Sequence, residues 1–267
     1  MKVTGYSKPR TPKEAYELLK SHPKNQVIGG GAWLKLAGGA IETLISLEDL
    51  GLGSIKETSD HVFIGSMTTL RSLETSPVIQ TLQGGVLAKA AGLIMGLNVR
   101  NIATIGGSVM GRFGFSDILT ALLAIEAKLV FFGRGEIGLE AYLETRNPEK
   151  DILLAVKVPI LKAVSMFHKE SRTSLDFAII NLAIVKSESK IMIAVGSRPQ
   201  GPVLASKAMG YLAMRSPISA EDLEIAGKLI IEEIDFKDNL KASAEYRRHL
   251  AKVLSVRMLK AVMGFED

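Results

Sequence analysis

The order of apolar and polar positions divides the first part of the chain into short strands and helices. The segment Thr11-Pro12-Lys13-Glu14 has the form of a helix start, with a capping hydroxyl, a first-turn proline and a glutamate three residues after the cap. Apolar runs between turn signals predict strands at 26–28, 42–47, 62–65, 128–132 and 151–158, and helices at 69–74, 82–94 and after Ser116. Alternating strands and helices predict two α/β subdomains, of about 1–55 and 56–160.

Beyond Pro159 the pattern changes to successive strands followed by helices. Strands are expected at 165–169, 177–185 and 190–195, and the polar turn at 186–189 predicts that the last two form an antiparallel hairpin. Helices are expected at 219–231 and 243–263. In the last helix Tyr246 is assigned to the apolar face, and Arg247 to a solvated or docking face. We therefore expect a second domain over 161–267.

Composition narrows the class of protein. Of the 267 residues 47% are hydrophobic and 23% charged, which is ordinary for a globular protein. No apolar run approaches the ~18 residues of a membrane span, and the first residues lack the apolar segment of a signal peptide. A cytoplasmic location without a membrane span is therefore expected. The net charge of +5 is dispersed, so no nucleic-acid partner is predicted, and a basic docking surface explains the charge equally well.

The chain contains no cysteine, which excludes disulfides, thiolate zinc sites, cysteine nucleophiles and protein-ligated iron–sulfur clusters. The four histidines are far apart in sequence and lack metal-ligand spacing. No metal site is predicted.

Two glycine-rich stretches are the candidate ligand sites. One, Gly29-Gly30-Gly31, directly follows a predicted strand, and the other is Thr104-Ile105-Gly106-Gly107-Ser108. Glycine lets backbone N–H groups approach a phosphate closely, and Thr104 and Ser108 add hydroxyls. A flexible connector for the first stretch and a tight turn with packing glycines for the second stay open as alternatives. Asp117 follows the capping residue Ser116 at a predicted helix start.

A third glycine-rich segment, residues 133–138, matches the G-x-G-x-x-G dinucleotide pattern after a strand. The segment that follows it, residues 139–145, is too short for the crossover helix of a βαβ unit. An exposed turn is therefore predicted instead.

Taken together, these motifs resemble a known family. The run from Arg100 to Ser108, then Ser116-Asp117 and residues 122–127, resembles the signature of the FAD-binding medium subunit of molybdenum hydroxylases. These are the flavoproteins of xanthine dehydrogenase and carbon monoxide dehydrogenase. Residues 28–34 are similar to the first flavin loop of that family, and residues 243–250 to its C-terminal S-A-E-Y-R-R helix. The resemblance covers essentially the whole chain, in the same order.

The resemblance implies an α+β fold. Residues 1–160 would form the vanillyl-alcohol-oxidase-like, PCMH-type FAD-binding fold of two α/β subdomains. Residues 161–267 would form a C-terminal domain of the carbon monoxide dehydrogenase flavoprotein type, with a three-stranded antiparallel sheet and helices.

The resemblance also implies a set of cofactor-binding residues. The loop that would wrap the FAD diphosphate comprises Ile28, Gly29, Gly30, Gly31, Ala32, Trp33 and Leu34. The residues that would hold the diphosphate, ribityl and adenosine portions are Thr104, Gly107, Ser108, Gly111 and Asp117. Ile94 would pack against the cofactor, and Leu153 would lie over the isoalloxazine. His168 falls near a lysine of the family, with Lys169 as a substitute. No side chain is expected to act as a catalytic acid, base or nucleophile.

By the same resemblance, the chain would be the electron-transfer subunit of a hetero-oligomer. Because FAD exchanges single electrons and electron pairs, it would connect iron–sulfur clusters on a partner with an acceptor such as NAD. A large molybdopterin subunit would carry the substrate chemistry. Ala32-Trp33 replaces the usual Thr-Asp of the first loop, so a flavin-poor scaffold or assembly subunit is one alternative. A stand-alone flavoenzyme acting on a small alcohol is another, and turnover by the isolated chain would distinguish it.

Overall fold

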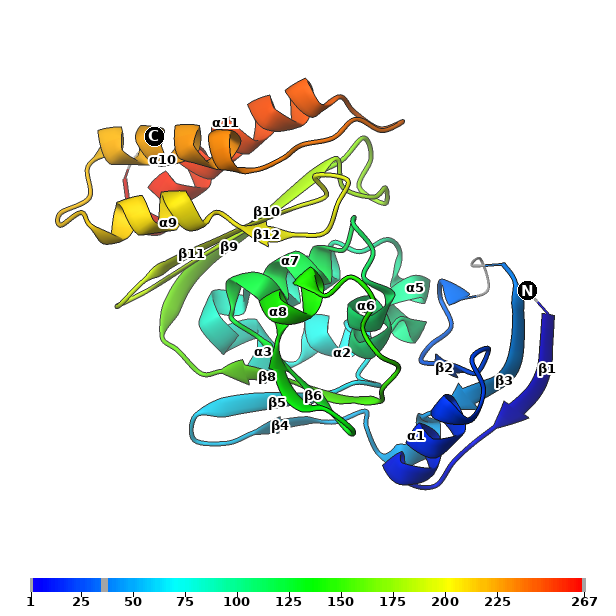
Figure 1. Ribbon diagram of the computed structural model, residues 1–267. Helices are drawn as coiled ribbons and strands as arrows, with labels where there is room; N and C mark the ends of the chain where they lie inside the picture. The colour runs from blue at the N-terminus through cyan, green and yellow to red at the C-terminus, as the bar shows by residue number, and fades with distance from the viewer. Residues whose placement is uncertain (1, 35–37, 266–267) are drawn as a thin grey trace. The chain divides into compact units, whose positions relative to one another are not determined.

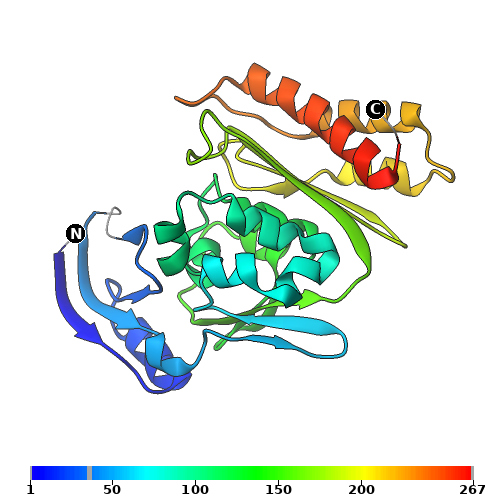
Figure 2. The same cartoon turned by 180° about the vertical axis from the view of Figure 1, so that it is seen from behind.

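The computed structural model describes residues 2–34 and 38–265. The chain forms two compact units, and neither is one continuous stretch of sequence (Figures 1 and 2). Unit 1 comprises Met1–Leu73, Gly96–Gly111 and Glu126–Pro159, and unit 2 comprises Glu74–Met95, Arg112–Ile125 and Ile160–Asp267. The expected boundary near residue 160 coincides with the last crossing between the units. Unit 2, however, also includes segments 74–95 and 112–125, which precede that boundary. The assignment of 1–160 and 161–267 as separate domains stays a prediction.

Unit 1 begins with a small parallel sheet. Its elements are β1 (Lys2–Ser7), α1 (Pro12–Ser21), β2 (Gln26–Ile28) and β3 (Ala40–Ser46), followed by the 3₁₀ helix η2 (Glu48–Leu50). The strands lie in the order β1-β3-β2. Thr11 caps α1 as predicted, since its hydroxyl accepts a hydrogen bond from the Glu14 N–H at 3.1 Å. Ala15 and Leu19 of α1 pack on Ile45 of β3, which fixes the helix on the sheet.

The second part of unit 1 is an antiparallel sheet with short helices. Its strands are β4 (Ile55–Glu57), β5 (His61–Gly65), β6 (Lys128–Phe131), β7 (Gly135–Gly138) and β8 (Leu153–Pro159), in the order β4-β5-β8-β6-β7. The helices are α2 (Leu70–Thr75), which ends at the start of unit 2, α5 (Leu97–Ile102), α6 (Ile105–Gly111) and α8 (Leu139–Glu144). Helix α6 packs on β8, so the second glycine motif rests on this sheet.

The G-x-G-x-x-G segment forms the turn and second strand of the β6–β7 hairpin. The Asp151 carboxylate accepts hydrogen bonds from the backbone N–H groups of Gly133 at 2.9 Å and Arg134 at 3.0 Å. These bonds hold the turn in place. The predicted exposed turn is confirmed.

Unit 2 is built around an antiparallel sheet with helices on both faces (Figure 1). The strands β9 (Ala163–Glu170), β10 (Ile180–Ser187), β11 (Ile191–Gly196) and β12 (Val203–Leu204) lie in the order β12-β11-β10-β9. One face packs on α9 (Ser206–Ala213), α10 (Ala220–Glu233) and α11 (Ala244–Met263), through a core that includes Leu182, Ile184, Ile193 and Val195. Against the other face lies α7 (Asp117–Ala124), while α4 (Val86–Gly92) and the segment η3 (Leu82–Gly85) pack on β9, with α3 (Pro77–Thr81) just before them.

The expected α+β class with a C-terminal antiparallel sheet is confirmed, and the two-residue strand β12 extends the three predicted strands. The helix predicted over 82–94 begins only at Val86. Gln83, Gly84 and Gly85 have positive φ angles, which interrupt a right-handed helix. A Cβ at Gly84 would lie 2.8 Å from the backbone nitrogen of Ser165, so the chain passes close to β9 there.

The assignment of faces on α11 was wrong at its first turn. Arg247, expected on a solvated face, is 0% exposed, whereas Tyr246, expected on the apolar face, is 47% exposed. The Arg247 guanidinium donates to backbone carbonyls of Ile179, Ser197 and Lys237. Buried carbonyls that need a donor therefore override the hydrophobic pattern at this position.

Candidate functional site

In unit 1 the two glycine stretches lie against each other. The backbone at Gly30 touches the segment before α6 so closely that a Cβ there would collide with the carbonyl oxygen of Ile102. A Cβ at Gly29 would lie 2.6 Å from the Thr104 hydroxyl oxygen. The structure thus brings together the first loop and Thr104, which are about 70 residues apart in sequence.

The second glycine pair is not in a loop, as the sequence suggested, but in the first turn of α6. The Thr104 hydroxyl accepts a hydrogen bond from the Gly107 N–H at 3.1 Å, and the Gly106 N–H donates to the Ser66 carbonyl at 2.8 Å. A capping hydroxyl thus starts a helix in spite of two glycines, each of which costs about 1 kcal/mol in a helix interior. The Ser108 hydroxyl donates to the Thr104 carbonyl at 3.1 Å.

This arrangement fits the approach of a phosphate group. Gly107 is exposed, and among the described residues, apart from its chain neighbours and the backbone of α6, the Thr104 hydroxyl oxygen, at 3.2 Å, is the one heavy atom within 4 Å of a Cβ placed there. The space beside Thr104 is therefore open on the side of Gly107. Gly111 ends α6 and is exposed, and Leu153 begins β8, where it is buried.

In unit 2 the candidate binding residues are centred on Asp117. Ser116 caps α7 as predicted, accepting from the Leu119 N–H at 3.2 Å. Asp117 is only 5% exposed. Its Oδ1 accepts a hydrogen bond from Asn181 Nδ2 at 2.5 Å, and its Oδ2 lies 3.8 Å from Lys169 Nζ. Asp117 is therefore held in a polar cluster of its own unit.

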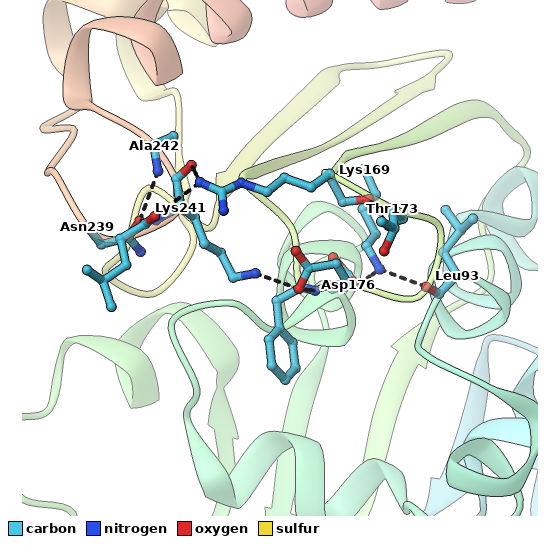
Figure 3. Close-up of polar contacts among 12 residues, drawn as sticks. Leu93, Lys169, Thr173, Asp176, Asn239, Lys241 and Ala242 are labelled. Atoms are coloured by element: carbon cyan, nitrogen blue, oxygen red, sulfur yellow. Dashed lines mark hydrogen bonds and ion pairs between the residues drawn. The ribbon is translucent and has the colours of Figure 1, made fainter.

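Lys169, rather than His168, is the residue beside Asp117. The Lys169 side chain is 4% exposed, and its ammonium group donates to the Leu93 carbonyl at 2.9 Å (Figure 3). Successive side chains of a strand point to opposite faces, so His168 points away and lies 3.3 Å from Glu170 Oε2. Ile94 directly follows Leu93, so its turn lies next to the Lys169 ammonium group.

Burial raises the pKa of Asp117 to about 6, although the nearby Lys169 charge and the hydrogen bond from Asn181 act in the opposite direction. The carboxylate is therefore ionised above pH 6 but poorly solvated. In that state it pairs with a nearly buried ammonium group, which leaves a fixed arrangement of one cation and one anion.

We expect the stability of the unliganded protein to fall as the pH rises from about 4 to about 7, because the folded protein must then ionise a buried carboxyl. A group whose pKa is raised in the folded state contributes stability below its unfolded pKa, and this is lost through the folded pKa. The loss should be about 2–3 kcal/mol and should be absent in Asp117→Asn. Urea unfolding of both proteins at several pH values measures it. Equal pH slopes would contradict the burial of an ionised Asp117.

Asn181 and Thr120, the neutral partners of this cluster, were not predicted from the sequence. Asn181 is 0% exposed, and the Thr120 hydroxyl donates to its Oδ1 at 2.8 Å. The available signal was a lone asparagine inside the apolar run Ile179-Ile180-Asn181-Leu182. Because a buried amide must be hydrogen-bonded, such a residue indicates a polar partner elsewhere in the chain.

Comparison with known proteins agrees with this architecture. Residues 2–161 match the family described as the FAD binding domain in molybdopterin dehydrogenase, and residues 165–262 match the CO dehydrogenase flavoprotein C-terminal domain. The chain belongs to this family of FAD-binding dehydrogenase subunits, and the resemblance seen in the sequence is confirmed.

Individual relatives match over nearly the full length. The chain is 27% identical to the uncharacterized protein YgfM of Escherichia coli K12, over 94% of this chain and 93% of that protein. It is 25% identical to the carbon monoxide dehydrogenase medium chain of Hydrogenophaga pseudoflava, over 96% of each. A solved carbon monoxide dehydrogenase of the same organism, one that lacks the Mo-pyranopterin moiety, contains a chain that is 27% identical with a TM-score of 0.87, over 97% of each.

As to membrane insertion, no helix over residues 2–34 and 38–265 combines the length and the apolar character that a bilayer crossing requires.

Proposed function

We propose that this chain is the electron-transferring flavoprotein subunit of a molybdenum hydroxylase-type complex, passing electrons from iron–sulfur clusters on a partner to an acceptor such as NAD. The observation that carries the proposal is that an FAD-binding dehydrogenase subunit has no cysteine. Cluster ligands must then come from another chain, and a large molybdopterin subunit would carry the organic substrate. A cytoplasmic location remains a prediction.

When bound, FAD supplies the exchange of single electrons and electron pairs; the residues of this chain would bind and orient it. In unit 1 we assign the diphosphate to the loop from Ile28 to Leu34 and to the Thr104–Gly107 turn, because the loop packs on Thr104 and Gly107 is open. Ser108, Gly111 and Leu153 keep the roles that the resemblance implies.

In unit 2 we assign Asp117 and Ile94 to the cofactor site, with Lys169 in place of His168. The support is geometric, since Lys169 lies 3.8 Å from Asp117 whereas His168 lies on the other face of β9. Asp117 would accept hydrogen bonds from cofactor hydroxyls, and Lys169 would keep its carboxylate ionised.

The first test uses Trp33, the single tryptophan of the chain. Trp33 replaces an acidic residue of the first loop, and an indole N–H donates but cannot accept hydrogen bonds. We expect the isolated chain to purify largely without flavin, to bind added FAD weakly, and to change its Trp33 fluorescence on binding. Unchanged fluorescence at saturating FAD, together with a purified complex that lacks flavin, would support the scaffold alternative instead.

The second test concerns the partner. Arg248 is exposed on α11, and Lys252 lies one turn further along the same face, so this helix offers a basic surface for an acidic cluster-bearing subunit. We expect co-expression with a cysteine-rich neighbour to give a complex in size-exclusion chromatography, and the double change Arg248→Glu with Lys252→Glu to weaken it while the isolated chain keeps its circular dichroism spectrum. If the chain elutes alone with every candidate partner, the proposed assembly is wrong.

A further inference from the structure

The amide of Asn181 lies between two polar side chains of α7. Its Nδ2 donates to Asp117 Oδ1 at 2.5 Å, and its Oδ1 accepts from the Thr120 hydroxyl at 2.8 Å. The Thr120 hydroxyl also lies 3.2 Å from the Ser116 carbonyl oxygen. Because Thr120 supplies the donor, the amide of Asn181 presents its own donor to the carboxylate. The hydrogen bond from Thr120 therefore fixes which end of the Asn181 amide faces Asp117.

The hydrogen-bonded side chains of Asn181 and Thr120 occupy the space where a side chain at Gly196 would lie. Gly196 of β11 is the register partner of Asn181, and a Cβ at Gly196 would collide with Thr120 Oγ1 and Asn181 Oδ1. Any larger residue would displace the hydrogen-bonded pair. A buried polar pair in an otherwise apolar sheet costs free energy of desolvation unless it is fully hydrogen-bonded. Here the pair is bonded to a group of the candidate cofactor site.

We infer that Asn181 is a positioning residue of the flavin site, which fixes the Asp117 carboxylate and, through it, the Lys169 ammonium group. Thr120 supports Asn181 in this role. The inference rests on the proposed function, because Asp117 and Lys169 matter for the cofactor only if they contact it. Nothing in the resemblance assigned a role to Asn181 or Thr120.

The contribution of Asn181 can be measured through the ionisation of Asp117, because few groups face this carboxylate. Among the described residues, the charged group facing it is Lys169 on β9, while Asn181 on β10 is neutral. A hydrogen bond to the ionised carboxylate favours ionisation, so its loss should raise the pKa of Asp117 further. A purely structural role for Asn181 would change stability without changing this titration.

The experiment measures FAD affinity of the full chain by Trp33 fluorescence from pH 5 to pH 8, together with its urea unfolding at the same pH values. The variants are Asn181→Leu, Thr120→Val and Thr120→Ser, of which the last keeps the hydroxyl. Ile184→Val is the matched control, because Ile184 lies on the same strand but in the core that faces the C-terminal helices.

We expect Asn181→Leu to lower FAD affinity about tenfold or more at pH 7 and to move the midpoint of the pH profile upward by about one unit. Thr120→Val should act in the same direction but less strongly, Thr120→Ser should behave like the wild type, and Ile184→Val should leave the midpoint unchanged. Reduced stability of Asn181→Leu with unchanged affinity and midpoint would overturn the inference.

The unfolding data separate this inference from the proposed function. If the wild type binds no FAD in any form, the proposed function fails, and the pH dependence of unfolding still shows whether Asn181 controls the ionisation of Asp117. If the free energy of unfolding changes around the same pH in Asn181→Leu as in the wild type, this result alone rejects the positioning role.

Discussion

Gly30→Ala is expected to abolish FAD binding and to lower the free energy of unfolding by about 1–3 kcal/mol or more. The added methyl group would collide with the carbonyl oxygen of Ile102, and a backbone atom cannot move aside as a flexible side chain can. The first loop must therefore leave its place beside Thr104. Fluorescence titration with FAD and urea unfolding of the same sample measure the two effects.

Gly107→Ala is the matched comparison. Its methyl group would meet Thr104 Oγ1 at 3.2 Å and otherwise enter open space, while alanine favours the helix by about 1 kcal/mol. Stability should be nearly unchanged and FAD affinity reduced about tenfold or more, because the space beside the capping hydroxyl is occupied. If Gly107→Ala binds FAD like the wild type, the diphosphate does not lie beside α6.

Arg247→Met should lower the free energy of unfolding by about 3–5 kcal/mol. The Arg247 guanidinium donates to the carbonyls of Ile179 and Ser197 and to Asn239 Oδ1, and its Nε donates to the Lys237 carbonyl at 3.2 Å. Methionine keeps the apolar contacts but leaves these buried acceptors without a donor. Calorimetry or urea unfolding of the unliganded chain gives the loss.

Two further variants make this result specific. Arg257 is exposed on the same helix, so Arg257→Met should change stability by less than about 0.5 kcal/mol. Arg247→Lys should recover part of the loss, because an ammonium group supplies three donors but lacks the planar fork of a guanidinium. If Arg247→Met and Arg257→Met are equally stable, Arg247 does not hold this region together.

Local signals predicted the parts of the fold that depend on them. The caps at Thr11 and Ser116 and the β10–β11 hairpin were confirmed, since each is set by a few neighbouring residues. Strand β1 and helix α9 were not predicted. β1 is mostly exposed, so its sequence lacks an apolar pattern, and pairing with β3 specifies it instead.

Candidate site residues that lie within a local sequence motif could be proposed from the sequence. Those that are brought together by long-range packing could not. The sequence singled out the first glycine loop, whose role in binding flavin stays a prediction, but it could not show that Gly30 touches Ile102 or that Thr104 caps a helix. The cluster around Asp117 joins residues about 60 positions apart, and Asn181 and Lys169 acquire their environment only when the sheet forms. Buried polar contacts of this kind leave almost no periodic signal.

The interleaving of the two units governs what a break in the chain would do. The chain passes between units after Leu73, Met95, Gly111, Ile125 and Pro159. A protease that cuts at any one of these points produces two fragments that both contribute to a common unit, so the nicked protein should migrate as one species on a native gel and as two on a denaturing gel. A gene truncated at residue 160 would instead yield α4 and α7 without the strands β9 to β11 on which they pack, and such a product should aggregate.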